Sequence, residues 1–65
     1  MRIKEIRKAK RITQVKMAMD LDMCQNTLSR YETGVREPGI NDLIRIADYL
    51  NVSLDDLVGR PFPKN

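Results

Sequence analysis

Residues 13–34 read TQVKMAMDLDMCQNTLSRYETG, and this stretch decides the fold. Thr13 is a residue type that caps a helix N-terminus. The apolar residues that follow recur at the three-to-four spacing of one buried helical stripe, namely Met17, Ala18 and Leu21. The pattern breaks at residues 22–24, where a turn is predicted. The stretch therefore predicts a short amphipathic helix, a sharp turn and a second short helix.

The second helix of this stretch is predicted from Gln25 to about Glu32. Its buried side would carry Leu28 and Tyr31, and its exposed side would carry four polar residues: Gln25, Asn26, Ser29 and Arg30. Gln and Asn can form two hydrogen bonds to adenine in the major groove of DNA, and Arg can do the same to guanine. A short helix that begins with these residue types is therefore predicted to be a recognition helix.

A set of apolar and turn positions stands in fixed register along the chain: Thr13-Gln14, Ala18, Thr27, Leu28-Ser29-Arg30-Tyr31-Glu32, Gly34, Arg36-Glu37-Pro38 and Ile46-Ala47-Asp48. Together they resemble the phage-repressor helix-turn-helix family of the Cro/C1 type, also called XRE. The resemblance covers roughly residues 2–58. It implies an all-α, five-helix lambda-repressor-like DNA-binding domain, in which helices 2 and 3 form the helix-turn-helix.

The resemblance also implies roles for single residues. Contacts to DNA bases fall to Gln25, Asn26, Ser29 and Arg30. Contacts to phosphates fall to Thr13, Gln14, Thr33 and Arg36, and Gln14 also braces Gln25. Arg7 is implied to pair with Glu32 and so to tie the first helix to the end of the third, with phosphate contact as its alternative role. Removing one partner would then leave a partly buried charge without compensation.

Composition fits a small helical domain. The 65 residues are 42% hydrophobic and 5% aromatic, which suits one all-helical core at residues 1–59 followed by a short tail at residues 60–65. No segment reaches the roughly 18 apolar residues of a membrane span. No apolar signal-peptide core follows the basic start, so we expect a cytoplasmic protein. The start at Met1 and the full set of expected helices favour a complete small regulator.

Charge is unevenly distributed along the chain. The net charge is +3, but residues 1–36 hold nine basic and four acidic residues, a net of +5. The remaining residues hold three basic and five acidic ones, a net of −2. A basic half that contains the recognition helix would orient the domain toward the phosphates of DNA. The alternative is that the basic residues of the first helix are simply solvated.

The turn between the two helices carries two unusual residues. The family commonly has Gly where Asp22 stands, and we predict a positive φ for Asp22, because Asp tolerates the left-handed region better than most side chains. Cys24 stands where a hydroxyl usually caps the recognition helix, and a thiol caps poorly. A redox-sensitive thiol is an alternative interpretation of Cys24.

The remaining helices follow from local signals. A first helix is predicted from about Arg2 to Lys10, with Ile3 and Ile6 facing the core and Ile12 buried after it. A fourth is predicted from about Ile40 to Leu50, with five apolar positions that back the domain: Leu43, Ile44, Ile46, Ala47 and Leu50. Ser53 is predicted to cap a short fifth helix, which ends at Gly59.

The end of the chain offers candidates for a dimer interface. In related repressors the region beside the fifth helix forms a two-fold dimer, so the exposed parts of four residues are the candidates here: Leu54, Leu57, Val58 and Phe62. The alternative for Phe62 is that it packs on its own domain. Such a homodimer would place two recognition helices about 34 Å apart. It would then read a palindromic operator on double-stranded DNA.

Two other classes of function compete with DNA binding. Val15 and Met19 stand four apart at positions that are usually polar in this family, and such exposed apolar residues are commonly inert surface. The alternative is a partner-binding patch, with which the same fold could serve as a protein-interaction module or as the antitoxin of a toxin-antitoxin pair. Catalysis is disfavoured because the chain has no histidine and its single thiol has no base. No cofactor and no metal site are expected, since one cysteine without histidines cannot form a zinc set.

Overall fold

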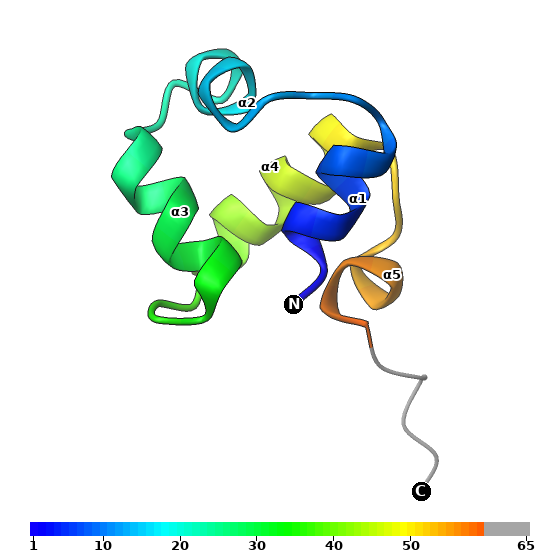
Figure 1. Ribbon diagram of the computed structural model, residues 1–65. Coiled ribbons are helices and arrows are strands. Elements are labelled where there is room, and N and C mark those ends of the chain that lie inside the picture. The colour runs from blue at the N-terminus through cyan, green and yellow to red at the C-terminus, as the bar shows by residue number, and fades with distance from the viewer. Residues whose placement is uncertain (60–65) are drawn as a thin grey trace, which may run out of the picture.

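The computed structural model describes residues 1–59, which form five helices and no strand. The helices are α1 (Ile3–Ala9), α2 (Gln14–Asp20), α3 (Gln25–Thr33), α4 (Ile40–Leu50) and α5 (Leu54–Val58). The predicted all-α fold is thus confirmed (Figure 1). The ends of α1, α3 and α4 agree with the predicted ranges to within one residue. Of the helices in this part of the chain, none is long and apolar enough to cross a membrane.

Local signals set the ends of α2 and α3. The side chain of Thr13 caps α2, because its hydroxyl accepts a hydrogen bond of 3.1 Å from the backbone amide of Lys16. Asp22 has the predicted left-handed backbone, with φ of 54°. Gly34 ends α3 with φ of 81°, a conformation that costs glycine little. The two helices therefore meet at a sharp turn at one side of the molecule (Figure 1).

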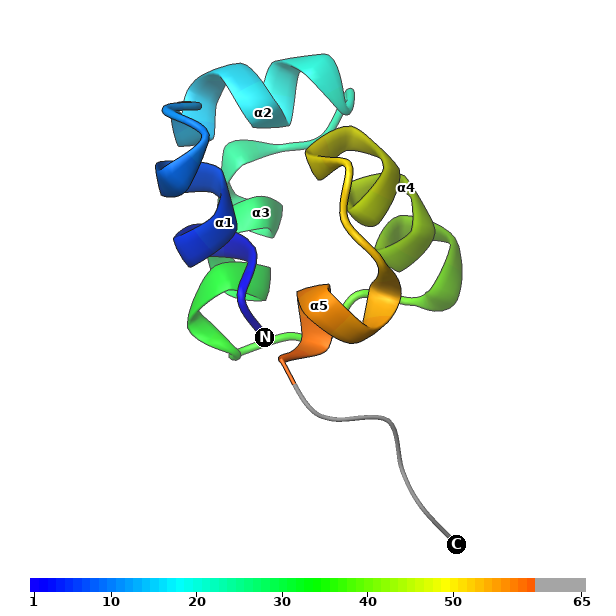
Figure 2. The same ribbon diagram turned by 90° about the vertical axis from the view of Figure 1, so that its right-hand side faces the viewer.

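A single apolar core lies between the helices. Its buried residues come from all five: Ile3, Ile6, Met17, Ala18, Leu21, Leu28, Tyr31, Ile46, Ala47, Leu50 and Leu57. The first helix packs against both α3 and α4, and α5 packs against α4 (Figure 2). The start of the chain joins α5 through a hydrogen bond of 2.8 Å from the amide of Arg2 to the carbonyl of Leu57. Helices α1, α4 and α5 thus form the support on which the helix-turn-helix rests.

Two expectations about the core are wrong. Ile44 does not back the core, since 43% of it is exposed; the buried stripe of α4 runs through Ile46, Ala47 and Leu50, on another side of that helix. Ile12 is only half-buried and packs against the edge of the core. The first error arises because an apolar residue in a periodic stretch need not lie on the stripe that faces inward. Ile12 lies in the connection between α1 and α2, outside any helical stripe.

Candidate nucleic-acid interface

The four predicted base-contacting residues lie along α3. Gln25, Asn26 and Arg30 are exposed, and Ser29 is half-buried. Gln25 and Asn26 occupy the first turn of the helix, so their amide side chains extend from its N-terminal end. Leu28 and Tyr31 are buried on the opposite side. The amphipathic pattern predicted for this helix is therefore confirmed.

The four predicted phosphate-contacting residues lie near the two ends of the helix-turn-helix. Thr13 is exposed and Gln14 is half-buried at the start of α2. Thr33 and Arg36 are exposed at the end of α3 and just beyond it. The hydroxyl of Thr33 and the backbone amide of Arg36 each donate a hydrogen bond of 3.3 Å to the carbonyl oxygen of Arg30. This carbonyl thereby fixes the path of the loop that presents Arg36.

A buried ion pair anchors the end of α3 to α1. The Nε atom of Arg7 donates to Oε2 of Glu32 at 2.7 Å, and Nη2 donates to Oε1 at 3.2 Å. The side chains are only 8% and 2% exposed. A third bond of 2.8 Å runs from Nη1 of Arg7 to the carbonyl of Ile12. The ion pair implied by the family resemblance is thus present with two parallel hydrogen bonds, the strongest arrangement for this pair of side chains.

Two glutamines continue this network to the surface. The Nε2 atom of Gln14 donates to Oε1 of Glu32 at 3.0 Å, and the Nε2 atom of Gln25 donates to Oε1 of Gln14 at 3.0 Å. Gln14 therefore braces Gln25, as the family resemblance implied. The exposed amide of Gln25 is the outer end of a hydrogen-bonded chain that begins at Arg7 in the protein interior.

Sequence reasoning missed three polar side chains of α4 that hold the helix-turn-helix in place: Asp42, Arg45 and Tyr49. The hydroxyl of Tyr31 donates to Oδ2 of Asp42 at 2.8 Å. This hydrogen bond, together with burial, raises the pKa of the Tyr31 phenol above its ordinary value. The bond joins α3 to α4 at the same end of α3 as the buried ion pair.

Arg45 and Tyr49 attach α4 to the end of α2. The guanidinium of Arg45 donates to the carbonyl of Leu21, and the hydroxyl of Tyr49 donates to Oδ2 of Asp20 at 2.6 Å. The hydrogen bond from Tyr49, followed by that from Lys16, lowers the pKa of Asp20. These partners lie 24 and 29 positions apart in the chain, so no local pattern could have revealed them.

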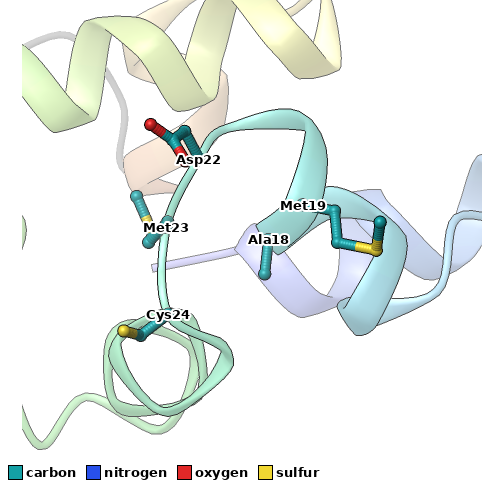
Figure 3. Close-up of a pocket in the computed structure, with 5 residues that line it drawn as sticks. All are labelled: Ala18, Met19, Asp22, Met23 and Cys24. Atoms are coloured by element: carbon teal, nitrogen blue, oxygen red, sulfur yellow. The ribbon is translucent and has the colours of Figure 1, made fainter.

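The connection between α2 and α3 forms an open hollow on the surface. Its lining residues are Ala18, Met19, Asp22, Met23 and Cys24 (Figure 3). The thiol of Cys24 points away from Met19 in this view. Within residues 1–59, this thiol accepts no capping hydrogen bond from α3, although Cys24 is the N-cap residue of that helix. The expectation that a thiol caps poorly is confirmed.

The dimer-interface candidates are only partly usable. Leu57 is fully buried in the core, with 0% exposed, so it cannot contribute to a surface contact and its selection was wrong. It faces inward because the short α5 turns this side chain toward α4. Leu54 is exposed and Val58 is half-buried, so both remain candidates. Phe62 lies outside the described residues.

Comparison with known proteins agrees with this architecture. The helix-turn-helix family matches residues 3–57. The chain belongs to this family. The match includes α1 to α4 and all but the last residue of α5, so the family assignment covers the support as well as α2 and α3.

Three curated proteins are similar to the chain. An uncharacterized HTH-type transcriptional regulator, YqaE of Bacillus subtilis, is 43% identical over 56 residues, which is 86% of the chain and 48% of YqaE. The cryptic phage CTXphi transcriptional repressor RstR of Vibrio cholerae is 39% identical over 59 residues, 91% of the chain and 53% of RstR. The HTH-type transcriptional regulator ImmR of Bacillus subtilis is 37% identical over 59 residues, 91% of the chain and 46% of ImmR.

The chain spans about half the length of the curated relatives it matches. The alignments with these relatives cover 86–91% of the chain, and the family match covers residues 3–57. No solved structure matches the chain at a significant level.

Proposed function

We propose that this helix-turn-helix protein is a cytoplasmic, sequence-specific DNA-binding transcriptional regulator, a small repressor that inserts α3 into the major groove. The observation that carries the proposal is the first turn of α3. There, the exposed amides of Gln25 and Asn26 extend from the helix end, and Gln25 is held by Gln14. Side-chain amides in this position can pair with the edge of adenine, and Ser29 and Arg30 add further base contacts.

Phosphate contacts are assigned to the four residues at the ends of the helix-turn-helix: Thr13, Gln14, Thr33 and Arg36. Three of these side chains are exposed, and the loop carrying Arg36 is fixed by hydrogen bonds to the carbonyl of Arg30. The net charge of +5 in residues 1–36 supports the same orientation toward DNA. These contacts would position α3, whereas its first turn would choose the bases.

We further propose that two copies bind together. Leu54 is 39% exposed on α5 and Val58 is half-buried, which leaves apolar surface for a two-fold contact. A two-fold pair would place two α3 helices about 34 Å apart, one turn of the double helix. The operator would then be a palindrome with matching half-sites.

Selection of binding sites from random duplexes tests these proposals together. The expected result is a palindromic sequence with half-sites one helical turn apart. Absence of any enriched sequence would contradict sequence-specific binding, and enrichment of a single half-site would contradict the paired arrangement. The variant Arg36→Ala is expected to weaken binding to every duplex and to reduce the salt slope by about one, because it removes a phosphate contact.

A second candidate function is a protein-interaction module, such as an antitoxin. The observation that favours it is apolar surface on α2, where 49% of Val15 and 74% of Met19 are exposed, with Met19 beside the hollow of Figure 3. Gel filtration with cognate lysate would show a complex that survives high salt and is lost in Met19→Lys. The control Val35→Lys changes an exposed loop residue and should retain the complex.

A further inference from the structure

In the hydrogen-bonded network beneath Gln25, the chemistry of Glu32 fixes which side-chain atoms donate and which accept. Glu32 accepts hydrogen bonds from Arg7 at both carboxylate oxygens, and one of these oxygens also accepts from Gln14. A carboxylate engaged in this way can only accept. Gln14 must therefore turn its NH₂ group toward Glu32, so the hydrogen bond itself decides which end of this amide is nitrogen.

The orientation of the Gln14 amide in turn fixes the orientation of the Gln25 amide. Because the NH₂ group of Gln14 faces Glu32, its carbonyl oxygen is the atom that faces Gln25. This oxygen can only accept a hydrogen bond, so Gln25 must donate one. Its Nε2 atom lies 3.0 Å from Oε1 of Gln14. The carbonyl oxygen of Gln25 and the second N–H of its NH₂ group are then left for a ligand. One acceptor beside one donor matches adenine, which presents N6–H₂ and N7 in the major groove.

We propose that Glu32 is a positioning residue for sequence selectivity, because its charge acts through Gln14 to orient the amide of Gln25 for adenine. This inference rests on the proposed function, since it assumes that Gln25 contacts a base. We call the hydrogen bonds from Glu32 through Gln14 to Gln25 the relay. Without the relay, Gln25 could turn its NH₂ group outward and offer two donors. Two donors match the O6 and N7 acceptors of guanine.

Reversing the relay tests the proposal. In Gln14→Lys the ammonium group still donates to Glu32, but it offers Gln25 a donor in place of an acceptor. Gln25 must then accept with its carbonyl oxygen and present its NH₂ group to DNA. Site selection with purified protein is expected to show the base opposite Gln25 changing from adenine to guanine. The ratio of the two affinities should change by about tenfold or more, the range of one two-bond base contact.

Three further variants separate selectivity from folding and charge. Gln25→Ala identifies the base pair concerned, because preference is lost at that position alone. Gln14→Met offers no hydrogen-bonding atom and should allow both adenine and guanine there. Ala9→Lys adds a positive charge at an exposed position on α1 and should leave the base preference unchanged.

The outcomes distinguish the relay from the proposed function. Glu32→Gln, in protein shown to be folded by circular dichroism, should broaden the same position to adenine and guanine; Gln14→Lys and Gln14→Met test the relay independently if that variant does not fold. Retained adenine preference in Gln14→Lys, or guanine preference in the wild type, would overturn the relay alone. Failure of the wild type to select any sequence would instead overturn the proposed function.

Discussion

The two ends of α3 are held in different ways. At its C-terminal end, Glu32 is paired with Arg7, Tyr31 is bonded to Asp42, and Gly34 closes the helix in the left-handed conformation. At its N-terminal end, the structure ties Gln25 to Gln14 and leaves the rest of the first turn exposed. The helix is thus anchored at the end that is farther from its first-turn amides.

The two ends differ in how much they contribute to stability. Buried, charged contacts at the C-terminal end fix the helix in the domain, and they reach the DNA-facing side chains only through the bond from Gln14 to Glu32. The N-terminal end can then change its side chains with little cost to the fold, since exposed positions rarely contribute much to stability. Substitutions at the two ends should therefore have distinct signatures.

The largest effect is expected at the C-terminal end. In Glu32→Ala, Arg7 would stay buried without its partner, which typically costs about 3–5 kcal/mol. Urea denaturation should show this loss in the free energy of unfolding. The double variant Arg7→Met/Glu32→Met should lose less than Glu32→Ala, because an apolar pair leaves no buried charge.

The control for Glu32→Ala is Glu5→Ala. Glu5 pairs with Arg2 on the surface of α1, where both side chains are largely exposed. Exposed pairs contribute about 0–1 kcal/mol, so the free energy of unfolding should barely change. Equal losses in the two variants would contradict the anchoring role of the buried pair.

At the N-terminal end, substitutions of the two exposed amide side chains should alter DNA binding and leave stability intact. Gln25→Ala and Asn26→Ala are each expected to cost about 1–3 kcal/mol in binding free energy to a selected operator, with preference relaxed at particular base pairs. Fluorescence anisotropy with matched duplexes would measure both effects. Unchanged selectivity in both variants would remove these residues from base recognition.

The helix cap at the N-terminal end offers a smaller test. Cys24→Ser supplies a hydroxyl that can accept from the free amides of α3, as Ser53 does for the amide of Asp56 in α5. A cap of this kind contributes about 1 kcal/mol, so the free energy of unfolding should rise. Ser53→Ala is the opposite control and should lower it. A decrease in Cys24→Ser would show that the thiol contributes more than its geometry suggests.

The free energy of unfolding should respond less to glycine in the turn before α3 than to serine at the helix cap. Asp22 has φ of 54°, so Asp22→Gly removes backbone strain but adds freedom to the unfolded chain. We expect the free energy of unfolding to stay unchanged or to rise by about 0.5 kcal/mol. Asp22→Val, which places a branched side chain in the same conformation, should cost about 1–2 kcal/mol. Clear destabilisation by glycine would contradict the role assigned to this turn.

The smallest expected effect is the pH dependence of stability that comes from Tyr31 at the C-terminal end. Its bond to Asp42 raises the pKa of the phenol in the folded protein above the ordinary value near 10. The associated stability is therefore complete below about pH 10 and is lost as pH rises through the folded pKa. Absorbance titration should show late ionisation of Tyr31, and Tyr31→Phe should remove that step. Ionisation at the ordinary pKa would contradict the bond.

Sequence signals predicted features set by neighbouring residues better than they predicted the contacts that α4 makes with other helices. The helix ends, the cap at Thr13 and the left-handed Asp22 follow from residues close together in the chain. The bonds of Tyr31 to Asp42 and of Tyr49 to Asp20 join helices, and no periodic pattern encodes them.

Face assignment also limited the predictions. The prediction that Ile44 faces the core is wrong, because periodicity identifies apolar residues without saying which stripe a helix turns inward. The prediction of Leu57 at a dimer interface came from the family resemblance, and it is wrong because this side chain is buried in the core. The roles of Gln25 and Arg36 toward DNA stay predictions that the experiments above test. The Arg7–Glu32 pair was implied by family resemblance, since its partners lie 25 positions apart.

The position of the single thiol has a practical use. Cys24 is the only cysteine of the chain, is exposed, and immediately precedes Gln25. Its rate of alkylation, followed by mass spectrometry, would therefore report shielding of the start of α3. A DNA duplex that contacts this turn would slow the alkylation of Cys24. The fraction of protein bound to DNA can therefore be measured without any substitution.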